Sequence, residues 1–319
     1  MKHFLLKIIL FCVVLAGVYF SFMYKVSNGY VDENYPKFCQ EAGSLIIGVS
    51  TASQGISPQI LEDNLSEFNL EKPMVNFAIN FEQSQYGDTY LNAIKKKLKK
   101  SDKNGLFILS VSPISFSSVK NLEESAIEKL DQEKILGKIT NFTSAPNFDY
   151  ISNCYPISLY NAFYPTNKWD NLVVHPDGWN EFKLKSESYT VTKEDISDWK
   201  KKTIEFQDKF LKTQKISKTR FLSFTKTIDF LKQKGTVFIV RMPLTPESLQ
   251  LENEEWKNFN FQFDSIAKVK NISFLDYSET NSEYKTYDGT HMVSESAKKF
   301  SKTLSDDVKS ILLSDSIKK

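Results

Sequence analysis

Short apolar runs alternate with longer amphipathic stretches along most of the chain. Each run is continuous rather than alternating in polarity, which is typical of a strand buried on both faces of a parallel sheet. The runs span residues 45–49, 74–79, 106–111, 236–240 and 272–275. The stretches with helical spacing span residues 58–68, 86–100, 193–211, 219–234, 247–269 and 294–313. This order predicts an α/β fold of three layers, doubly wound, with a mainly parallel sheet of about five strands.

The N-terminal segment is a nearly uninterrupted apolar run. No charged residue occurs between Ile8 and Met23, and the run is longer if Lys7 extends its amine to the membrane interface. Because Lys2 and Lys7 precede the run, the positive-inside rule places the N-terminus in the cytoplasm. We therefore expect residues 1–25 to be a single-pass transmembrane anchor, with the main domain extracytoplasmic, in the periplasm or at the cell surface. The alternative is a cleaved signal peptide that releases a soluble hydrolase, although no small-x-small cleavage site follows the run.

The remainder of the chain divides into a short connecting segment and one large domain. Residues 26–43 are polar and turn-rich, so we expect a tether. Residues 44–319 then form the α/β domain. Its regular alternation is interrupted by a long insertion, about residues 113–192, where no periodicity is clear. Insertions of this length in α/β domains are often lids or substrate-binding caps.

Composition narrows the range of partners and cofactors. The 41 Lys and Arg residues nearly cancel the 39 Asp and Glu residues, so there is no electrostatic reason to expect nucleic acid as a partner. Cys39 and Cys154 could pair as a disulfide in an oxidising compartment, whereas Cys12 lies in the apolar N-terminal run. We expect no metal and no organic cofactor, because the sequence contains neither a paired CxxC site nor a glycine-rich phosphate loop after a strand.

A candidate nucleophile follows the first predicted strand. The strand ends in Gly48-Val49-Ser50, which places a hydroxyl at the carboxyl edge of the sheet, where ligands bind in such folds. The start of the next helix would offer free N–H groups and a favourable field for an oxyanion. Serine is also an ordinary helix cap, so Ser50 alone does not establish catalysis.

The second candidate element lies before the last helix, in Asp288-Gly289-Thr290-His291. An Asp and a His three residues apart can face one cleft, with the carboxylate orienting the imidazole. The chain contains only three histidines, and this one lies outside any apolar face. The alternative is that Asp288 only shapes a turn while His291 is a surface residue.

These two elements resemble the first and last blocks of the SGNH/GDSL hydrolases, in the order and separation typical of that family. The resemblance spans residues 44–312 approximately and implies Ser50 as nucleophile with Asp288 and His291 completing a triad. More narrowly, the architecture is similar to membrane-anchored proteins of the cell envelope, such as alginate and peptidoglycan O-acetyltransferases and the teichoic-acid D-alanylation protein. That likeness implies an envelope glycan or lipid as substrate and a membrane-bound acyltransferase as partner.

The chain departs from the family pattern at several positions. Val49 stands where the first block has Asp, and the second block lacks its glycine, which leaves Asn80 as a candidate oxyanion donor. The third block, Gly-x-Asn, is not visible after the third strand. Arg241 follows the fourth strand and is a candidate to bind a carboxylate or phosphate of the acceptor, or else forms a structural ion pair. His175 is an alternative base, but its neighbours are typical of a turn.

Together these features predict an extracytoplasmic serine esterase or O-acyltransferase acting on an envelope glycan or lipid. The alternative from another class is a non-catalytic SGNH-like scaffold that binds an acyltransferase partner or a polysaccharide. A flavodoxin-like cofactor binder would share the fold class but lacks the phosphate loop.

Overall fold

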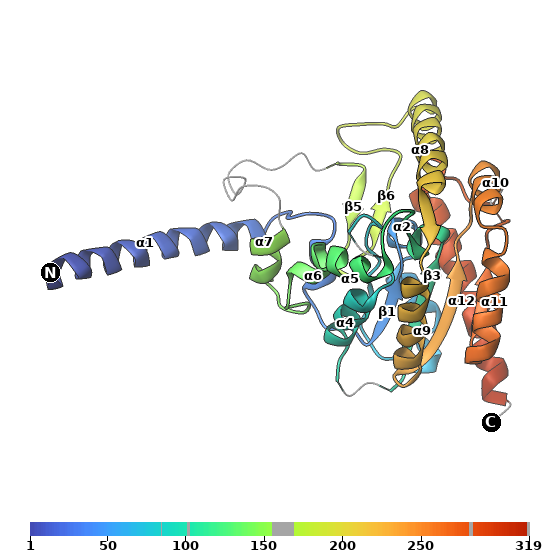
Figure 1. Ribbon diagram of the computed structural model, residues 1–319, viewed down its shortest axis with the longest axis horizontal. Helices are drawn as coiled ribbons and strands as arrows, with labels where there is room; N and C mark the ends of the chain where they lie inside the picture. The colour runs from blue at the N-terminus through green and yellow to red at the C-terminus, as the bar shows by residue number, and fades with distance from the viewer. Residues whose placement is uncertain (84, 101–102, 155–168, 281–282, 318–319) are drawn as a thin grey trace.

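The computed structural model describes residues 1–319 except 84, 101–102, 155–168, 281–282 and 318–319. Its centre is a five-stranded sheet in the order β2-β1-β3-β8-β9, in which every pairing is parallel (Figure 1). The strands are β1 (Ser44–Ile47), β2 (Met74–Asn76), β3 (Gly105–Val111), β8 (Gly235–Arg241) and β9 (Ser273–Asp276). The predicted α/β fold class is confirmed.

Successive residues of the central strands point into two separate cores, which explains why the apolar runs are continuous. Leu45 and Ile47 lie in one core and Ile46 in the other, and all three side chains are fully buried. The register pairs Ile46 with Ile108 and Leu109 with Ile239, so the buried rows continue from strand to strand. A strand with polar side chains at alternate positions would bury those side chains in one of the two apolar cores.

Helices cover both faces of the sheet and complete the three layers. Residues from α2, α3 and α12 line one core, and residues from α4, α9 and α11 line the other. The bounds are α2 (Ser50–Gly55), α3 (Pro58–Asn64), α4 (Asp88–Lys97), α9 (Lys218–Lys232), α11 (Phe259–Lys270) and α12 (Ser294–Ile317), with a 3-10 turn η2 (Ser66–Phe68) after α3. The single helix predicted over 247–269 is two, α10 (Pro246–Glu255) and α11, because the chain turns at Trp256, whose side chain is buried.

The described part of the insertion packs beside the domain as small elements. They are η3 (Pro113–Phe116), β4 (Ser117–Val119), α5 (Glu124–Gln132), α6 (Ile135–Lys138), α7 (Phe148–Cys154), β5 (Leu172–Val174) and β6 (Asn180–Phe182). β5 and β6 form an antiparallel pair, and β4 pairs with β7 (Gln214–Ile216). Residues 155–168 of the insertion lie outside the described residues. The helix that borders the candidate site is instead α8 (Lys193–Thr213), which follows the insertion and packs against α10 (Figure 1).

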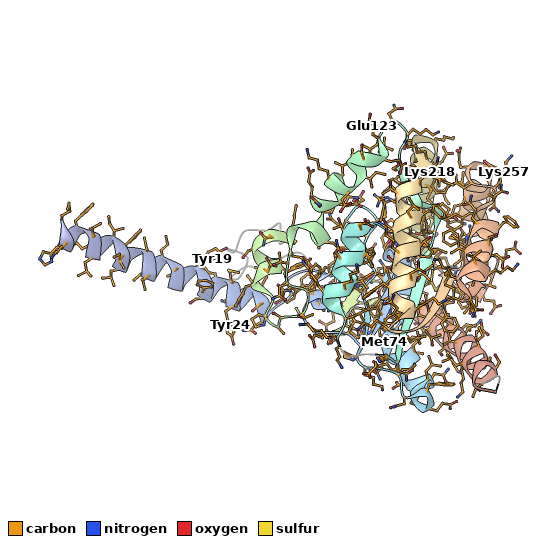
Figure 2. The ribbon with its side chains drawn as sticks, turned by 60° about the horizontal axis from the view of Figure 1, so that its bottom comes forward. Tyr19, Tyr24, Met74, Glu123, Lys218 and Lys257 are labelled. Carbon is orange, nitrogen blue, oxygen red and sulfur yellow. The ribbon has the colours of Figure 1, made fainter. Side chains whose placement is uncertain are left out.

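The apolar N-terminal run forms a single helix, α1 (Lys2–Ser27), that projects away from the domain. Its most apolar window has a mean hydropathy of 2.4 and is not buried by the rest of the chain. Figure 2 shows the side chains of α1 pointing outward along its length, with Tyr19 and Tyr24 near the domain. By length and composition this helix can cross a membrane, and a signal sequence would have the same properties.

The segment predicted as a tether is part of the domain. Val31, Tyr35 and Phe38 are buried in the core, the last two within a 3-10 turn, η1 (Tyr35–Phe38). The Asp32 carboxylate accepts hydrogen bonds from the Tyr150 hydroxyl at 2.9 Å and from the N–H of Tyr35 at 2.8 Å. Residues 26–43 therefore fix the base of α1 against the insertion rather than separating the two.

The pairing of Cys39 with Cys154, which the sequence left open, does not occur in the structure, where both residues are free thiols. The Cys39 Sγ donates to the carbonyl of Tyr35 at 3.2 Å, and the Cys154 Sγ lies 3.8 Å from the carbonyl of Ile135. The Cys39 thiol is thus satisfied within its own turn of chain, whereas the Cys154 thiol contacts a carbonyl 19 residues earlier, at the start of α6.

A buried lysine joins residues 26–43 to α2, to the end of β2 and to the turn between β5 and β6. The fully buried Lys37 amine donates to Ser53 Oγ at 3.0 Å, to the carbonyl of Asn76 at 3.3 Å and to the carbonyl of Gly178. Burial lowers the pKa of Lys37 to about 7, because the charged form loses its hydration; nearby carboxylates only partly oppose this effect. Lys97 is buried in the same way, with its pKa also lowered to about 7 by burial.

We predict that Lys37 makes the folded chain more stable as the pH rises above 7. Above that pH the folded protein has released the Lys37 proton while the unfolded chain, with an ordinary lysine pKa, still binds it. In Lys37→Met the rise in unfolding free energy between pH 7 and pH 9 should be shallower by up to about 1.4 kcal/mol per pH unit. Urea unfolding of the full chain in detergent measures this slope. The exposed Lys202→Met is the control, and parallel curves for wild type and Lys37→Met would contradict the prediction.

Candidate active site

Ser50 is brought to the carboxyl edge of the sheet by a sharp turn after β1. Gly48 has a φ of +155°, and a Cβ there would lie 2.7 Å from the Ser110 Cβ on β3, so only glycine fits this close approach. The Val49 carbonyl then accepts the N–H groups of Ala52 and Ser53, which starts α2. Ser50 is the first residue of that helix, where backbone N–H groups have no acceptor within the helix.

Asp288 and His291 come from a tight loop just before α12. The N–H of Tyr287 donates to the carbonyl of His291 at 3.0 Å, and Gly289 has a φ of +91°, a conformation that favours glycine. Asp288 Oδ1 accepts the N–H groups of Thr290 at 2.9 Å and of His291 at 2.8 Å. Asp288 therefore shapes the loop, as the simpler interpretation of the sequence proposed, and also contacts the imidazole.

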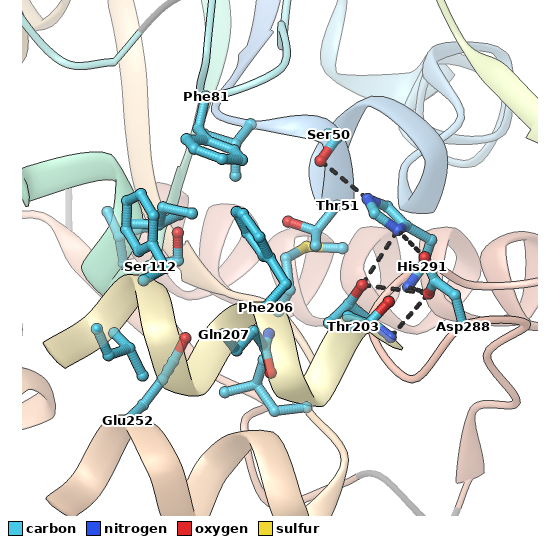
Figure 3. Close-up of a pocket in the computed structure, with 18 of the residues that line it drawn as sticks. Ser50, Thr51, Phe81, Ser112, Thr203, Phe206, Gln207, Glu252, Asp288 and His291 are labelled. Carbon is cyan, nitrogen blue, oxygen red and sulfur yellow. Dashed lines mark hydrogen bonds and ion pairs between the residues drawn. The ribbon is translucent and has the colours of Figure 1, made fainter. Parts of the chain in front are cut away.

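The structure brings the three sequence-predicted residues into one chain of contacts (Figure 3). Asp288 Oδ2 lies 2.6 Å from His291 Nδ1, and His291 Nε2 lies 2.8 Å from Ser50 Oγ, across 241 residues of sequence. An ionised carboxylate can only accept, so the neutral ring would donate from Nδ1 and leave Nε2 to accept the serine proton. Thr290 Oγ1 lies 3.1 Å from His291 Nδ1 and restricts the ring further.

Asp288 is in an environment that keeps it ionised. Burial raises the pKa of Asp288, but the neighbouring His291 ring and the backbone N–H groups of His291 and Thr290 outweigh burial, so the pKa lies below its ordinary value. The side chains of His291 and Asp288 are 19% and 14% exposed, so the pair is shielded but still reachable from solvent. A shielded carboxylate of this kind orients an imidazole and stabilises its charged form.

Aromatic packing positions the loop that carries the pair. The Tyr287 ring stacks on Phe182 with centroids 3.7 Å apart, and the Tyr287 hydroxyl donates to Gln54 Oε1 at 2.9 Å. Gln54 belongs to α2, the helix that begins at Ser50, so this bond links the two halves of the site directly. Sequence reasoning missed Gln54 and Tyr287, although each lies within four residues of a predicted site residue.

A largely apolar cavity of about 210 Å³ opens beside Ser50. The wall opposite the sheet comes from one face of α8, through Thr203, Phe206, Gln207, Phe210 and Leu211. The other lining residues come from the strand ends and the segments that follow them, from α10 and from the loop before α12: Val49, Ser50, Thr51, Phe81, Val111, Ser112, Ile114, Arg241, Met242, Leu244, Glu252, Asp288, Thr290 and His291. The contribution of α8 was not predicted; the spacing of Phe206 and Phe210, four apart, was the available signal.

Arg241 does not extend into open solvent to meet an acceptor. Its side chain is 2% exposed, its Nη2 donates to Glu252 Oε2 at 2.8 Å, and its guanidinium lies 5.0 Å from the centroid of the Phe259 ring. Of the two interpretations from the sequence, the structural ion pair is the one observed. Its Nε and Nη1 are buried without a hydrogen-bond partner and Arg241 lines the cavity, so its candidate role toward a carboxylate or phosphate of a substrate stays a prediction.

Asn80 and His175 are held by other contacts. Asn80 follows Ile79, whose N–H donates to the carbonyl of Gly48 at 3.1 Å, so it lies near the Ser50 turn. Its Oδ1 accepts the N–H of Glu82 at 3.0 Å, and it does not line the cavity; its role as oxyanion donor stays a prediction. His175 Nε2 contacts Glu181 Oε2 at 2.9 Å beside the β5–β6 turn and is not joined to Ser50.

In the part of the chain that the structure describes, no group of three or more His, Cys, Asp or Glu side chains is arranged to hold a metal ion.

Neither a family model nor a curated protein matches this sequence. Two solved esterase structures are similar to it over most of its length. One is Est24, a carbohydrate acetylesterase from Sinorhizobium meliloti, with 12% identity, a TM-score of 0.37, and coverage of 84% of this chain and 99% of that chain. The other is an inhibitor-bound aryl esterase from M. smegmatis, with 11% identity, a TM-score of 0.35, and coverage of 84% and 99%. A likeness at these scores carries no weight for the fold or function of this chain, which rest on its own geometry.

Proposed function

We propose that this protein is a serine esterase or O-acyltransferase of the SGNH type, with Ser50 as the nucleophile. The observation that carries the proposal is the position of His291, 2.8 Å from Ser50 Oγ and 2.6 Å from Asp288 Oδ2 through its two ring nitrogens. A nucleophile in reach of a base, with the base oriented by a third group, is the arrangement that activates a serine hydroxyl.

In the first half of the reaction, Ser50 Oγ attacks the ester carbonyl carbon while its proton passes to His291 Nε2. The carbonyl oxygen becomes an oxyanion, for which the N–H groups at the start of α2, those of Ser50 and Thr51, are the proposed donors. When the tetrahedral intermediate collapses, the bond to the alcohol oxygen breaks and His291 gives the proton to that oxygen. An acyl group then remains esterified to Ser50.

In the second half, water or an acceptor hydroxyl replaces the departed alcohol. His291 Nε2 takes a proton from it as it attacks the acyl carbon, and Ser50 recovers the proton when it leaves. Asp288 holds the imidazole in the tautomer that both halves require and stabilises its transient positive charge. Whether water or a hydroxyl attacks decides between an esterase and a transferase, and the same residues serve both.

The competing proposal, a non-catalytic scaffold, is favoured by the missing second and third sequence blocks of the resembled family. The position after the third strand carries Ser112, which lies 3.0 Å from the Ser115 hydroxyl and lines the cavity. A scaffold would have no need for a serine that reacts, so reactivity separates the two proposals.

We predict that a fluorophosphonate probe labels the full chain in detergent and that Ser50→Ala and His291→Ala abolish labelling. The probe reports the activated hydroxyl directly, so the loss should be at least about a hundredfold in rate, as expected when a base or nucleophile is removed. Ser112→Ala is the matched control, because it removes another serine from the same cavity, and it should label like the wild type. Labelling that survives in Ser50→Ala would contradict the proposal. A folded wild type that does not label would favour the scaffold.

We further propose that α1 anchors the protein in a membrane with the domain outside the cytoplasm, where an envelope glycan or lipid is the substrate and a membrane-bound acyltransferase is the partner. This proposal is supported by the length, hydropathy and exposure of α1 and by the positive charges of Lys2 and Lys7 near its start. It is also supported by the packing of residues 26–43 into the domain, which holds the domain close to the end of α1.

Fractionation tests the anchor. The full chain, expressed in a Gram-negative host, should stay in the membrane pellet after a carbonate wash, with an intact mass that includes residues 1–27. The domain should be degraded by protease added to spheroplasts, because it lies outside the inner membrane. A soluble mature chain that begins after residue 20 would show that the helix is a cleaved signal peptide and would contradict the anchor.

A further inference from the structure

We propose that the cavity beside Ser50 binds a neutral acyl chain of roughly six carbons, rather than an acetyl group or a charged acyl group. This inference rests on the proposed function and concerns its substrate. The cavity, at about 210 Å³, is larger than the apolar cavity of about 150 Å³ that accommodates benzene. An acetyl group would leave most of this space without a partner.

The cavity reaches from the His291 loop to Phe81 and Phe206, and its end away from His291 fits the acyl side of the ester. The leaving alcohol must lie next to His291 Nε2, because it takes its proton from that nitrogen. Phe81 and Phe206 stand on the other side of Ser50 from His291 (Figure 3). A substituent on the carbonyl carbon that points away from the leaving alcohol therefore enters the space between these rings and the sheet.

The walls suit a hydrocarbon. Val111 and Ile114 line the cavity from the end of β3 and the turn after it, Met242 lines it from the end of β8, and Phe206 and Phe210 line it from α8. Burying a methylene against such walls is favourable, by a factor of roughly four in binding for each fully buried group.

The charges in the lining argue against an ionic acyl group. Among the described lining residues, the charged side chains form two pairs, Arg241 with Glu252 at 2.8 Å and Asp288 with His291 at 2.6 Å, while Arg241 Nε and Nη1 are buried with no hydrogen-bond partner. A carboxylate or ammonium on the acyl chain would lose its hydration here, which is costly, and would have to compete with the partner that each charged side chain already has.

Three phenylalanine rings set the length limit. The Phe81 ring lies 5.3 Å from Phe210 and 6.0 Å from Phe206, and Phe206 lies 5.7 Å from Phe210, all between ring centroids. Phe81 and Phe210 also line a second cavity of about 430 Å³, whose other residues are more polar and include Glu82 and Gln85. Removing the Phe210 ring would therefore join the two cavities and admit longer chains.

The test uses ethyl p-nitrophenyl alkylphosphonates, uncharged diesters in which phosphorus replaces the acyl carbon and the alkyl group replaces the acyl chain. Ser50 Oγ forms a bond to phosphorus, its proton passes to His291 and p-nitrophenolate leaves, so no acceptor or partner is needed. For the full chain in detergent, the inactivation rate constant should rise from methyl to about hexyl, by up to fourfold per methylene, and fall for decyl. In Phe210→Ala the fastest probe should become octyl or decyl.

Phe261→Ala is the matched control, because Phe261 is 72% exposed on α11 and does not line the cavity, and its chain-length profile should equal that of the wild type. The acyl-chain proposal is overturned if the methyl probe reacts fastest with the wild type, or if Phe210→Ala leaves the profile unchanged. A folded chain whose Ser50 reacts with none of the probes would instead overturn the proposed function itself, so the two failures are distinguishable.

Discussion

The candidate site depends on the 2.6 Å contact between Asp288 and His291, because this contact decides which ring nitrogen carries the proton. With the proton on Nδ1, Nε2 is free to accept from Ser50; with the proton on Nε2, the same geometry would leave the serine without a base. The surrounding contacts hold this hydrogen bond in place. The His291 ring, followed by backbone N–H groups, lowers the pKa of Asp288 and keeps it ionised. The loop that carries both residues is held by the Tyr287 ring and hydroxyl.

The parallel sheet is what allows residues so far apart in sequence to meet. β1 lies near the centre of the sheet, so the turn after it opens onto the same edge as the ends of β3 and β8. α12 packs on α2 and α3 over one face, and the loop before α12 therefore arrives beside Ser50. The lining of the cavity follows from the same placement, because Val111 and Met242 mark the ends of the two neighbouring strands, and α8 covers that edge.

The sequence was sufficient for features that depend on local pattern. Continuous apolar runs predicted the five strands, and Ser50, Asp288 and His291 were identified from their places at a strand end and a loop before a helix; the structure brings these three side chains together. Features that depend on contacts between distant segments were not accessible. The pairing of Arg241 with Glu252 needs α10 to pack over the end of β8, and the burial of Tyr35 and Phe38 needs the insertion to meet residues that read as a polar tether. The same reason applies to the free thiols of Cys39 and Cys154 and to the position of α8 as a cavity wall, because both depend on how distant segments pack.

The most direct test of the account is the tautomer of the His291 ring, measured by nitrogen-15 NMR of the full chain in detergent with labelled histidine. The chain has three histidines, so variants at His3 and His175 assign the His291 signals. We predict that neutral His291 is protonated at Nδ1 with a free Nε2, and that Asp288→Asn, whose amide can donate to Nδ1, shifts the ring toward the Nε2-protonated tautomer. A wild-type ring protonated at Nε2 would contradict the proposed role of His291, because Ser50 would then have no acceptor for its proton.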